Sequence, residues 1–174
     1  ARFHLANSAA LWNSKGWKLE DYTHLARPGL SLHGIPPWAG EAPQGLRCVL
    51  SFKARVVAVA HLRPGECVGY GGIYRVPHGG APQEVAVLGA GYADGVPRNL
   101  SPRGRVWLGG KLRPLVGRVS MDVCAVRGNP GIRVGQFAEI LGPKVDFWEQ
   151  SSAAGTIPHE LLTRLTRRVE RVPR

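Results

Sequence analysis

The most restrictive feature of this sequence is the segment LSFKARVVAVAHL at residues 50–62, in which side chains of two kinds alternate. Alternation with a period of two is typical of a β-strand, because successive side chains point to opposite faces of a sheet. We predict a strand with one face formed by Phe52, Ala54, Val56 and Ala58, and the other by Lys53, Arg55, Val57 and Val59. A strand of this kind makes β structure the starting point for the whole chain.

Further segments typical of strands follow along the chain. They are EVAVLGAGY (84–92), RVWLGGKLRPLVG (105–117), VGRVSMDVCAVRG (116–128) and GQFAEILG (135–142). The second is predicted to be a hairpin closed by Gly109–Gly110, because a two-residue hairpin loop needs residues that tolerate positive φ angles. In the third, we expect one face to carry Val119, Met121, Val123 and Ala125, and the other to carry Arg118, Ser120, Asp122 and Cys124.

These segments predict a mainly β fold, with an antiparallel, β-barrel-like domain over residues 46–174. The 23 glycines and 14 prolines favour such a loop-rich β architecture over a helical bundle. After the strands we expect a loop and a short terminal helix that starts near Thr156 and has an apolar face of Leu161, Leu162, Leu165 and Val169. Residues 1–45 contain only short apolar pieces and a linker-like segment, GIPPWAGEAPQG (34–45), and do not form a complete fold.

Charge and composition argue against several classes of protein. The formal net charge is +11, but the arginines are spread along the chain and cluster only at its end. A solvated basic helix face explains that cluster more simply than nucleic-acid binding does. No apolar run approaches the roughly 18 to 20 residues of a membrane helix. The 3 cysteines form no CxxC pair and argue against a disulfide framework. We therefore predict a cytoplasmic protein with no membrane, nucleic-acid or metal site.

Three glycine-rich segments carry candidate functional residues: ECVGYGGIY (66–74), GAGYADGVPR (89–98) and GRVSMD (117–122). Each allows a structural interpretation as well as a functional one. Tyr70 or Tyr74 is either a functional residue or a structural aromatic residue beside a tight loop. Asp94 suits a turn, and Arg118 with Asp122 would form a surface ion pair of little energy. Composition and spacing do not decide between these alternatives.

Five segments of the chain occur in one order: HLANSAA (4–10), RPGLSLHG (27–34), LSFKARVVAVAHLRPGECVGYGGIY (50–74), GYADGVPR (91–98) and VGRVSMD (116–122). Together they resemble the C-terminal portion of alanine racemase, a pyridoxal-phosphate enzyme of bacterial cell-wall metabolism. The resemblance implies that residues 1–45 are the last elements of a cofactor-binding (β/α)8 barrel and that residues 46–174 are the C-terminal β domain. It also implies that the lysine that attaches the cofactor is not in this chain.

The resemblance implies that L- and D-alanine are interconverted by two acid/base groups on opposite faces of the substrate. Tyr70 would be one of these groups and the cofactor lysine the other, while Tyr74 is interpreted as structural. A free phenol has a pKa of about 10, so it acts as a base at neutral pH only where cations favour its ionised form. Arg98 and Arg118 are the candidate cations.

The same resemblance assigns substrate contacts and a partner. Met121 would bind the substrate carboxylate through its backbone N–H group, and Tyr92 would stand at the substrate entry. Asp122 and Arg98 would lie near the same corridor. Because the tyrosine base in this family serves the barrel of the other subunit, the resemblance implies a homodimer with shared active sites.

Cofactor contacts are implied for the first part of the chain. Ser8 would hold the phosphate of pyridoxal phosphate together with the backbone N–H groups of Gly29 and Leu30, since small polar and glycine donors suit an anion. Arg27 would face the pyridine nitrogen, which then stays unprotonated because arginine does not give up its proton. One departure is Glu170, which stands where some family members have a tyrosine that contacts the phosphate.

Two alternatives to this interpretation stay open. One is a non-catalytic β module that dimerises or binds a partner, and the other is a racemase for a different amino acid, since Met121 and Tyr92 do not dictate the size of the substrate side chain. An upstream lysine motif and binding of the cofactor would separate them. Because the cofactor lysine is not expected among these 174 residues, we predict no racemase activity for the isolated chain.

Overall fold

Backbone contacts divide the chain into two units, residues 1–50 and residues 51–174. The computed structural model describes residues 2–13 and 25–173. In the first unit, strands β1 (Ala6–Asn7) and β2 (Ala26–Arg27) pair in parallel. Helix α1 (Ser8–Trp12) follows β1 directly, and a 3₁₀ helix, η2 (Leu30–His33), follows β2. A parallel pair with a helix after its first strand is the local arrangement of a β-α-β unit.

Side-chain and backbone hydrogen bonds explain how this first unit starts its helix. Asn7 is the N-cap of α1, and its side chain accepts a hydrogen bond from the Ala10 N–H group at 3.0 Å. An asparagine cap satisfies one of the N–H groups that have no partner inside a helix. The cap brings the chain from strand β1 directly into α1, so that Ser8 becomes the first helical residue.

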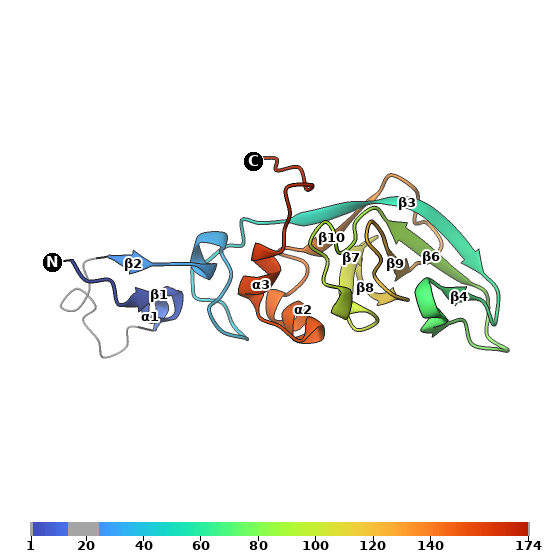
Figure 1. Cartoon of the computed structure of the whole chain (residues 1–174), viewed down its shortest axis with the longest axis horizontal. Coiled ribbons are helices and arrows are strands. Elements are labelled where there is room, and N and C mark those ends of the chain that lie inside the picture. The colour runs from blue at the N-terminus through green and yellow to red at the C-terminus, as the bar shows by residue number, and fades with distance from the viewer. Residues whose placement is uncertain (1, 14–24, 174) are drawn as a thin grey trace. The chain divides into compact units, whose positions relative to one another are not determined.

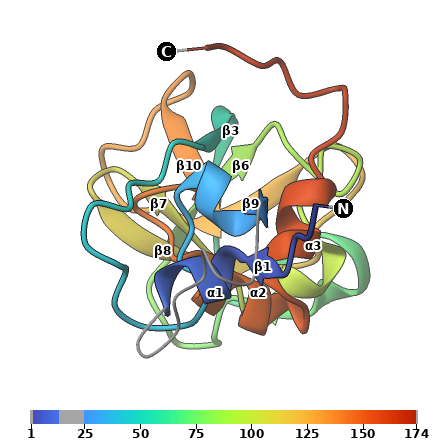
Figure 2. The ribbon, with the colours of Figure 1, turned by 90° about the vertical axis from the view of Figure 1, so that its left-hand side faces the viewer.

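The second unit is built on a closed barrel of six antiparallel strands in the order β10-β3-β6-β9-β8-β7. The strands are β3 (Phe52–Leu62), β6 (Gln83–Leu88), β7 (Arg105–Leu108), β8 (Lys111–Val116), β9 (Cys124–Arg127) and β10 (Phe137–Leu141). Figure 2 shows them arranged around a common interior. Closure removes unpaired sheet edges. The predicted mainly β, antiparallel barrel is therefore confirmed.

Strand β3 is long enough to pair with β10 along its first part and with β6 along the rest. Phe52, Ala54 and Val56 are buried, as the alternation predicts. Ala58 is exposed, so its predicted place on the same face is wrong. The register with β6 shifts between Val56 and Ala58, and an extra residue of this kind reverses the face to which every later side chain points.

The hairpin of β7 and β8 is confirmed. Leu108 pairs with Lys111, which leaves Gly109 and Gly110 as the two-residue loop. Their φ angles are 59° and 80°, in the left-handed region that a type I′ turn requires. At the other end of β8, however, the strand predicted over residues 116–128 is much shorter than expected, because only Cys124–Arg127 form β9.

Residues 117–123 form a loop instead of a strand, and Met121 is exposed rather than on an apolar face. Gly117 has a φ of 69°, and a Cβ atom at this position would lie 2.6 Å from the Val68 carbonyl oxygen. The N–H and hydroxyl groups of Ser120 both donate to the Val123 carbonyl, which closes a tight turn. The alternation in the sequence continues through this loop, but the backbone leaves the sheet at Gly117.

Two helices follow the barrel strands, α2 (Phe147–Ala154) and α3 (Pro158–Thr163), and lie together at one end of the barrel in Figure 1. The single terminal helix predicted up to Val169 is wrong in length, since α3 ends at Thr163. The helix α2 was not predicted, although Asp146 caps it by accepting a hydrogen bond from Glu149 N–H at 2.8 Å. None of the described helices is long and apolar enough to cross a membrane.

The interior of the barrel is filled by aliphatic side chains from alternate strand positions. Among the largest that are fully buried are Val56, Leu88, Leu108, Leu115 and Ile140. Cys124, at the start of β9, is buried with them, whereas Cys67 is exposed. Burial, and secondly the negative charge of Asp94, raise the pKa of Cys124 to about 12.

Because the pKa of Cys124 is raised on folding, its neutral thiol contributes fully to stability below about pH 8.5 and loses this contribution as the pH rises further. We predict that the free energy of unfolding falls between pH 7 and pH 10 by up to about 2 kcal/mol more in the unmodified protein than in Cys124→Ala. Urea unfolding at both pH values measures the difference. Cys67→Ala removes an exposed thiol and should keep the original pH dependence; equal dependence in all three proteins would contradict the prediction.

Candidate active site

Tyr70 stands at the tip of a small hairpin formed by β4 (Cys67–Val68) and β5 (Tyr74–Arg75). The tip is a 3₁₀ turn, η3 (Tyr70–Gly72), and the glycines at 69, 71 and 72 have φ angles of 66°, 70° and 54°. Glycine adopts this left-handed region without the steric cost that other residues meet. The result is a tight loop that leaves the Tyr70 side chain 74% exposed.

Tyr74 has a different environment four residues later. Its hydroxyl group donates to the Gln83 side chain on β6, and the Arg127 guanidinium lies 5.9 Å from the centre of its ring. The ring is half-buried and packs against a buried cluster that includes Val85 and Val116. These contacts are those of a structural aromatic residue, so the two tyrosines of the segment differ in what they can do.

The loop at residues 117–123 touches the Tyr70 hairpin at its beginning. A Cβ atom on Gly71 would lie 3.4 Å from Nε of Arg118, and one on Gly69 would lie 3.5 Å from the Arg118 backbone nitrogen. The guanidinium of Arg118 therefore lies against the turn that presents Tyr70. Arg98, the other predicted cation, begins the 3₁₀ helix η4 (Arg98–Leu100) and is exposed, and its side chain makes no hydrogen bond or ion pair within the described residues.

The same loop touches the Tyr92 segment at its far end. The N–H groups of Tyr92 and Ala93 donate to the carbonyl oxygens of Ser120 and Met121 at 2.9 and 3.0 Å. A Cβ atom on Gly91 would lie 2.3 Å from both of these carbonyl oxygens, so only glycine allows the approach. Tyr92 and Met121 are thereby brought together on neighbouring loops, and their side chains are about half exposed, at 47% and 51%.

Met121 has one free polar group that matters chemically. Its carbonyl oxygen accepts the Ala93 N–H group, but within the described part of the chain its own N–H group has no hydrogen-bond acceptor. An N–H group on a loop next to an exposed tyrosine is able to bind an anion such as a carboxylate.

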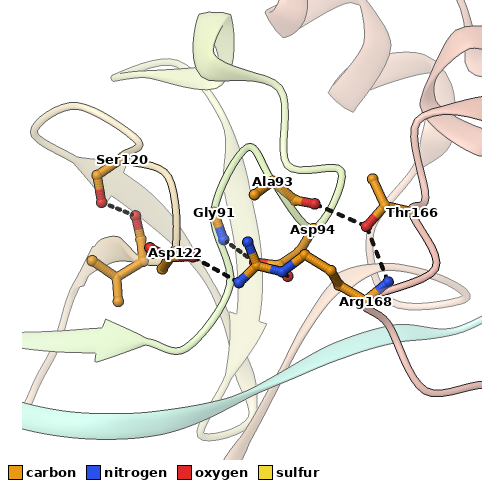
Figure 3. Close-up of polar contacts among 8 residues, drawn as sticks. Gly91, Ala93, Asp94, Ser120, Asp122, Thr166 and Arg168 are labelled. Carbon is orange, nitrogen blue, oxygen red and sulfur yellow. Dashed lines mark hydrogen bonds and ion pairs between the residues drawn. The ribbon is translucent and has the colours of Figure 1, made fainter.

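Arg168 connects the two loops through their carboxylates, as Figure 3 shows. Its Nη2 donates to Asp122 at 2.6 Å, and its Nε lies 3.3 Å from Asp94. The surface pair considered for Arg118 and Asp122 is therefore not formed, because Asp122 pairs with Arg168. Sequence reasoning missed this residue and placed it on a solvated basic face, since nothing in its local sequence indicates partners 46 or more residues away.

The cofactor residues implied by resemblance lie in the first unit, where Ser8 is buried. Its hydroxyl oxygen accepts the N–H groups of Gly29 and Ser31 at 2.9 and 3.3 Å. The resemblance assigns the Gly29 N–H group to the cofactor phosphate, but here this group donates a hydrogen bond to Ser8. Leu30 is buried and Arg27 is exposed on β2.

A model of the family described as alanine racemase, C-terminal domain, matches residues 49–173. The chain belongs to the alanine racemase family. The alanine racemase of Nitrosococcus oceani is 39% identical over 173 residues, which cover 96% of this chain and 46% of that protein.

Solved alanine racemases have the same fold over the same region. The biosynthetic enzyme of Pseudomonas aeruginosa is 34% identical with a TM-score of 0.87, over 99% of this chain and 48% of that one. The enzyme of Bartonella henselae, solved with covalently bound pyridoxal phosphate, is 32% identical with a TM-score of 0.84, over 99% and 47% of the two chains. This chain therefore spans about half the length of the alanine racemases that it matches.

The approach of the two loops at Gly91 gives a prediction for stability. Gly91→Ala should lower the free energy of unfolding by more than about 2 kcal/mol, because the new methyl group meets backbone oxygens that cannot rotate away. Urea unfolding measures this loss. Gly110→Ala is the comparison, since its φ is 80° but nothing lies within 4 Å of the added atom, and left-handed strain alone costs about 1 kcal/mol. A smaller loss for Gly91→Ala than for Gly110→Ala would contradict the steric explanation.

Proposed function

We propose that this chain is the C-terminal part of a pyridoxal-phosphate-dependent racemase that interconverts L- and D-alanine, with Tyr70 as one of two acid/base groups. One observation carries the proposal: a single loop, residues 117–123, lies against the exposed Tyr70 turn at one end and presents the unpaired Met121 N–H group beside Tyr92 at the other. An amino-acid racemase needs one group that transfers a proton and another that binds the substrate carboxylate. Here the first lies beside one end of the loop and the second lies at its other end.

Tyr70 is suited to move a proton because it is exposed at the tip of a tight glycine turn. Three glycines with left-handed φ angles define the turn, so the phenol is presented without a bulky neighbour on either side. Arg118 is the candidate cation whose guanidinium lies against this turn. Arg98 is proposed to be a second cation near the substrate entry. When it is bound, pyridoxal phosphate withdraws electrons from the substrate and makes the α-proton more acidic.

Met121 and Tyr92 are proposed to bind the substrate. The Met121 N–H group would donate a hydrogen bond to the substrate carboxylate, and Tyr92 would orient the substrate from the neighbouring loop. Asp122, which follows Met121 directly, would set the charge of the entry together with its partner Arg168. None of these contacts involves the substrate side chain, so alanine is proposed on the strength of the family.

The first unit fits the phosphate end of the cofactor. Two N–H groups already occupy the Ser8 oxygen, so its hydroxyl hydrogen is left to donate to an anion. We propose that Ser8 holds the phosphate together with the backbone N–H group of Leu30, while the Gly29 N–H group, which donates to Ser8, orients this hydroxyl group. Arg27, whose charge is permanent, would face the pyridine nitrogen. The attachment lysine is proposed to lie in another part of the complete protein.

A homodimer is proposed because Tyr70 is 74% exposed, and a second subunit that covers it would exclude water from the proton transfer. The barrel of a second subunit would supply this cover and the cofactor. We also propose a cytoplasmic location, where exposed thiols such as that of Cys67 stay reduced.

The first test is Tyr70→Phe in the complete protein, expressed with the coding region upstream of Ala1 and supplied with pyridoxal phosphate. Racemisation of alanine should fall by at least about 100-fold, because one of the two proton-transfer groups is lost. Exchange of the α-proton with deuterated water should persist for one enantiomer, since the other base still acts on its face. Chiral chromatography and mass spectrometry measure the two reactions.

Tyr74→Phe is the matched control, because it also removes a tyrosine hydroxyl from the same hairpin and should keep activity within about threefold. No racemisation in the unmodified complete protein would exclude the proposed function and favour a non-catalytic module. Racemisation that Tyr70→Phe leaves unchanged would exclude the assignment of Tyr70. Faster turnover of another amino acid would replace alanine as substrate.

The role of Met121 is tested by separating its side chain from its backbone. Met121→Ala keeps the N–H group and should change kcat/KM for alanine by less than about threefold, whereas Met121→Pro removes this donor and should lower kcat/KM at least about tenfold. Circular dichroism checks that both variants are folded. A large loss in Met121→Ala would mean that the side chain, and not the backbone, makes the contact.

A further inference from the structure

We propose that Arg168 is a positioning residue for substrate binding, because it holds the loop of Tyr92 and the loop of Met121 in one arrangement. This inference rests on the proposed function of those two loops. Arg168 lies near the end of the chain, after helix α3, and its guanidinium spans the carboxylates of Asp94 and Asp122 (Figure 3). It therefore links three segments that are distant in the sequence.

The two carboxylates differ in how firmly they are fixed. Asp94 is mostly buried, at 14% exposure of its side chain, and its Oδ2 accepts the Gly91 N–H group at 2.9 Å. Asp122 has a side chain that is 60% exposed, and its only ion-pair partner in the described structure is Arg168. Arg168 thus ties the more exposed carboxylate of the Met121 loop to the mostly buried, hydrogen-bonded carboxylate of the Tyr92 loop.

Other contacts hold the Arg168 segment in place. The hydroxyl group of Thr166 donates to the Ala93 carbonyl at 2.8 Å, and the Arg168 N–H group donates to Thr166 Oγ1 at 3.4 Å. A Cβ atom on Gly95 would lie 2.7 Å from the Arg164 carbonyl oxygen, so the backbones of the two segments touch there. The guanidinium is attached to a segment that is itself fixed to the Tyr92 loop.

Electrostatics explain why the guanidinium matters more than a single exposed ion pair would. Both carboxylates lie within reach of one cation, and without it they would be two like charges facing each other across the boundary between the loops. Their repulsion would move the Met121 loop, whose residues before β9 have no strand partner. The planar guanidinium fork can donate to both carboxylates at once, which a lysine side chain cannot do in the same way.

The test uses the complete protein with pyridoxal phosphate. Arg168→Ala should raise KM for alanine about three- to tenfold and leave kcat within about twofold, because Met121 and Tyr92 bind substrate while the turn of Tyr70 does not contact Arg168. Arg168→Lys should recover part of the loss. Adding Asp122→Asn to Arg168→Ala should lower KM again, since it removes one of the two repelling charges.

Arg164→Ala is the matched control. It removes one positive charge from the same segment, but the Arg164 side chain pairs with Glu160 in the first turn of α3 and not with either loop. It should leave KM unchanged within about twofold. A rise in KM equal to that of Arg168→Ala, or no rise in Arg168→Ala, would overturn the inference while the racemase activity itself still stood. A further loss in the Asp122→Asn double variant would also overturn it.

Amide hydrogen exchange separates this inference from the proposed function. Arg168→Ala should increase exchange at least about threefold at the N–H groups of Tyr92 and Ala93, whose acceptors lie on the Met121 loop, and Arg164→Ala should not. If the complete protein does not racemise alanine, the proposed function fails, and the exchange result alone decides whether Arg168 holds the loops. Unchanged exchange in Arg168→Ala would overturn the inference whether or not the protein is active.

Discussion

The candidate site depends on contact between backbones at two glycines, Gly91 and Gly117. A Cβ atom at Gly91 would lie 2.3 Å from the carbonyl oxygens of Ser120 and Met121, and one at Gly117 would lie 2.6 Å from the carbonyl oxygen of Val68. These contacts hold the loop at residues 117–123 between the hairpin that carries Tyr70 and the loop that carries Tyr92. The closed barrel supplies the base, because the loop that carries Tyr92 begins where β6 ends and the loop at residues 117–123 begins where β8 ends. Chemistry that needs fixed groups on loops requires such a scaffold.

Acidic side chains are few in this cationic chain, with 12 Asp and Glu against 23 Lys and Arg, and several of them organise loops. Asp94 accepts the Gly91 N–H group and pairs with Arg168, while Asp146 caps α2. Glu139 on β10 accepts hydrogen bonds from the Ser51 hydroxyl and from the Lys144 N–H group. At least one of the arginines, Arg168, is therefore used within the molecule, where it joins two loops that connect barrel strands.

The parts of the fold that could be predicted from the sequence are those specified by neighbouring residues. Alternation indicates β3, and the pair Gly109–Gly110 indicates the hairpin, because a period of two and a positive φ are properties of adjacent residues. The same rule fails at residues 117–123, where alternation continues but Gly117 turns the backbone out of the sheet. It fails again in the last segment, where apolar spacing predicts more helix than the Thr163 end of α3 allows.

The sequence by itself determined the type of fold and the family resemblance, because strand alternation and the order of the motifs can be read from neighbouring residues. Tyr70 was singled out by that resemblance and not by spacing, which did not separate it from Tyr74. Only the tertiary structure decided that Tyr70 is exposed while Tyr74 is packed, and that Asp122 pairs with Arg168 and not with Arg118. The physical reason is distance along the chain. Pairing of Arg168 with a residue 46 positions away, and contact of one backbone with another at a glycine, follow from barrel closure and leave no pattern among neighbouring residues.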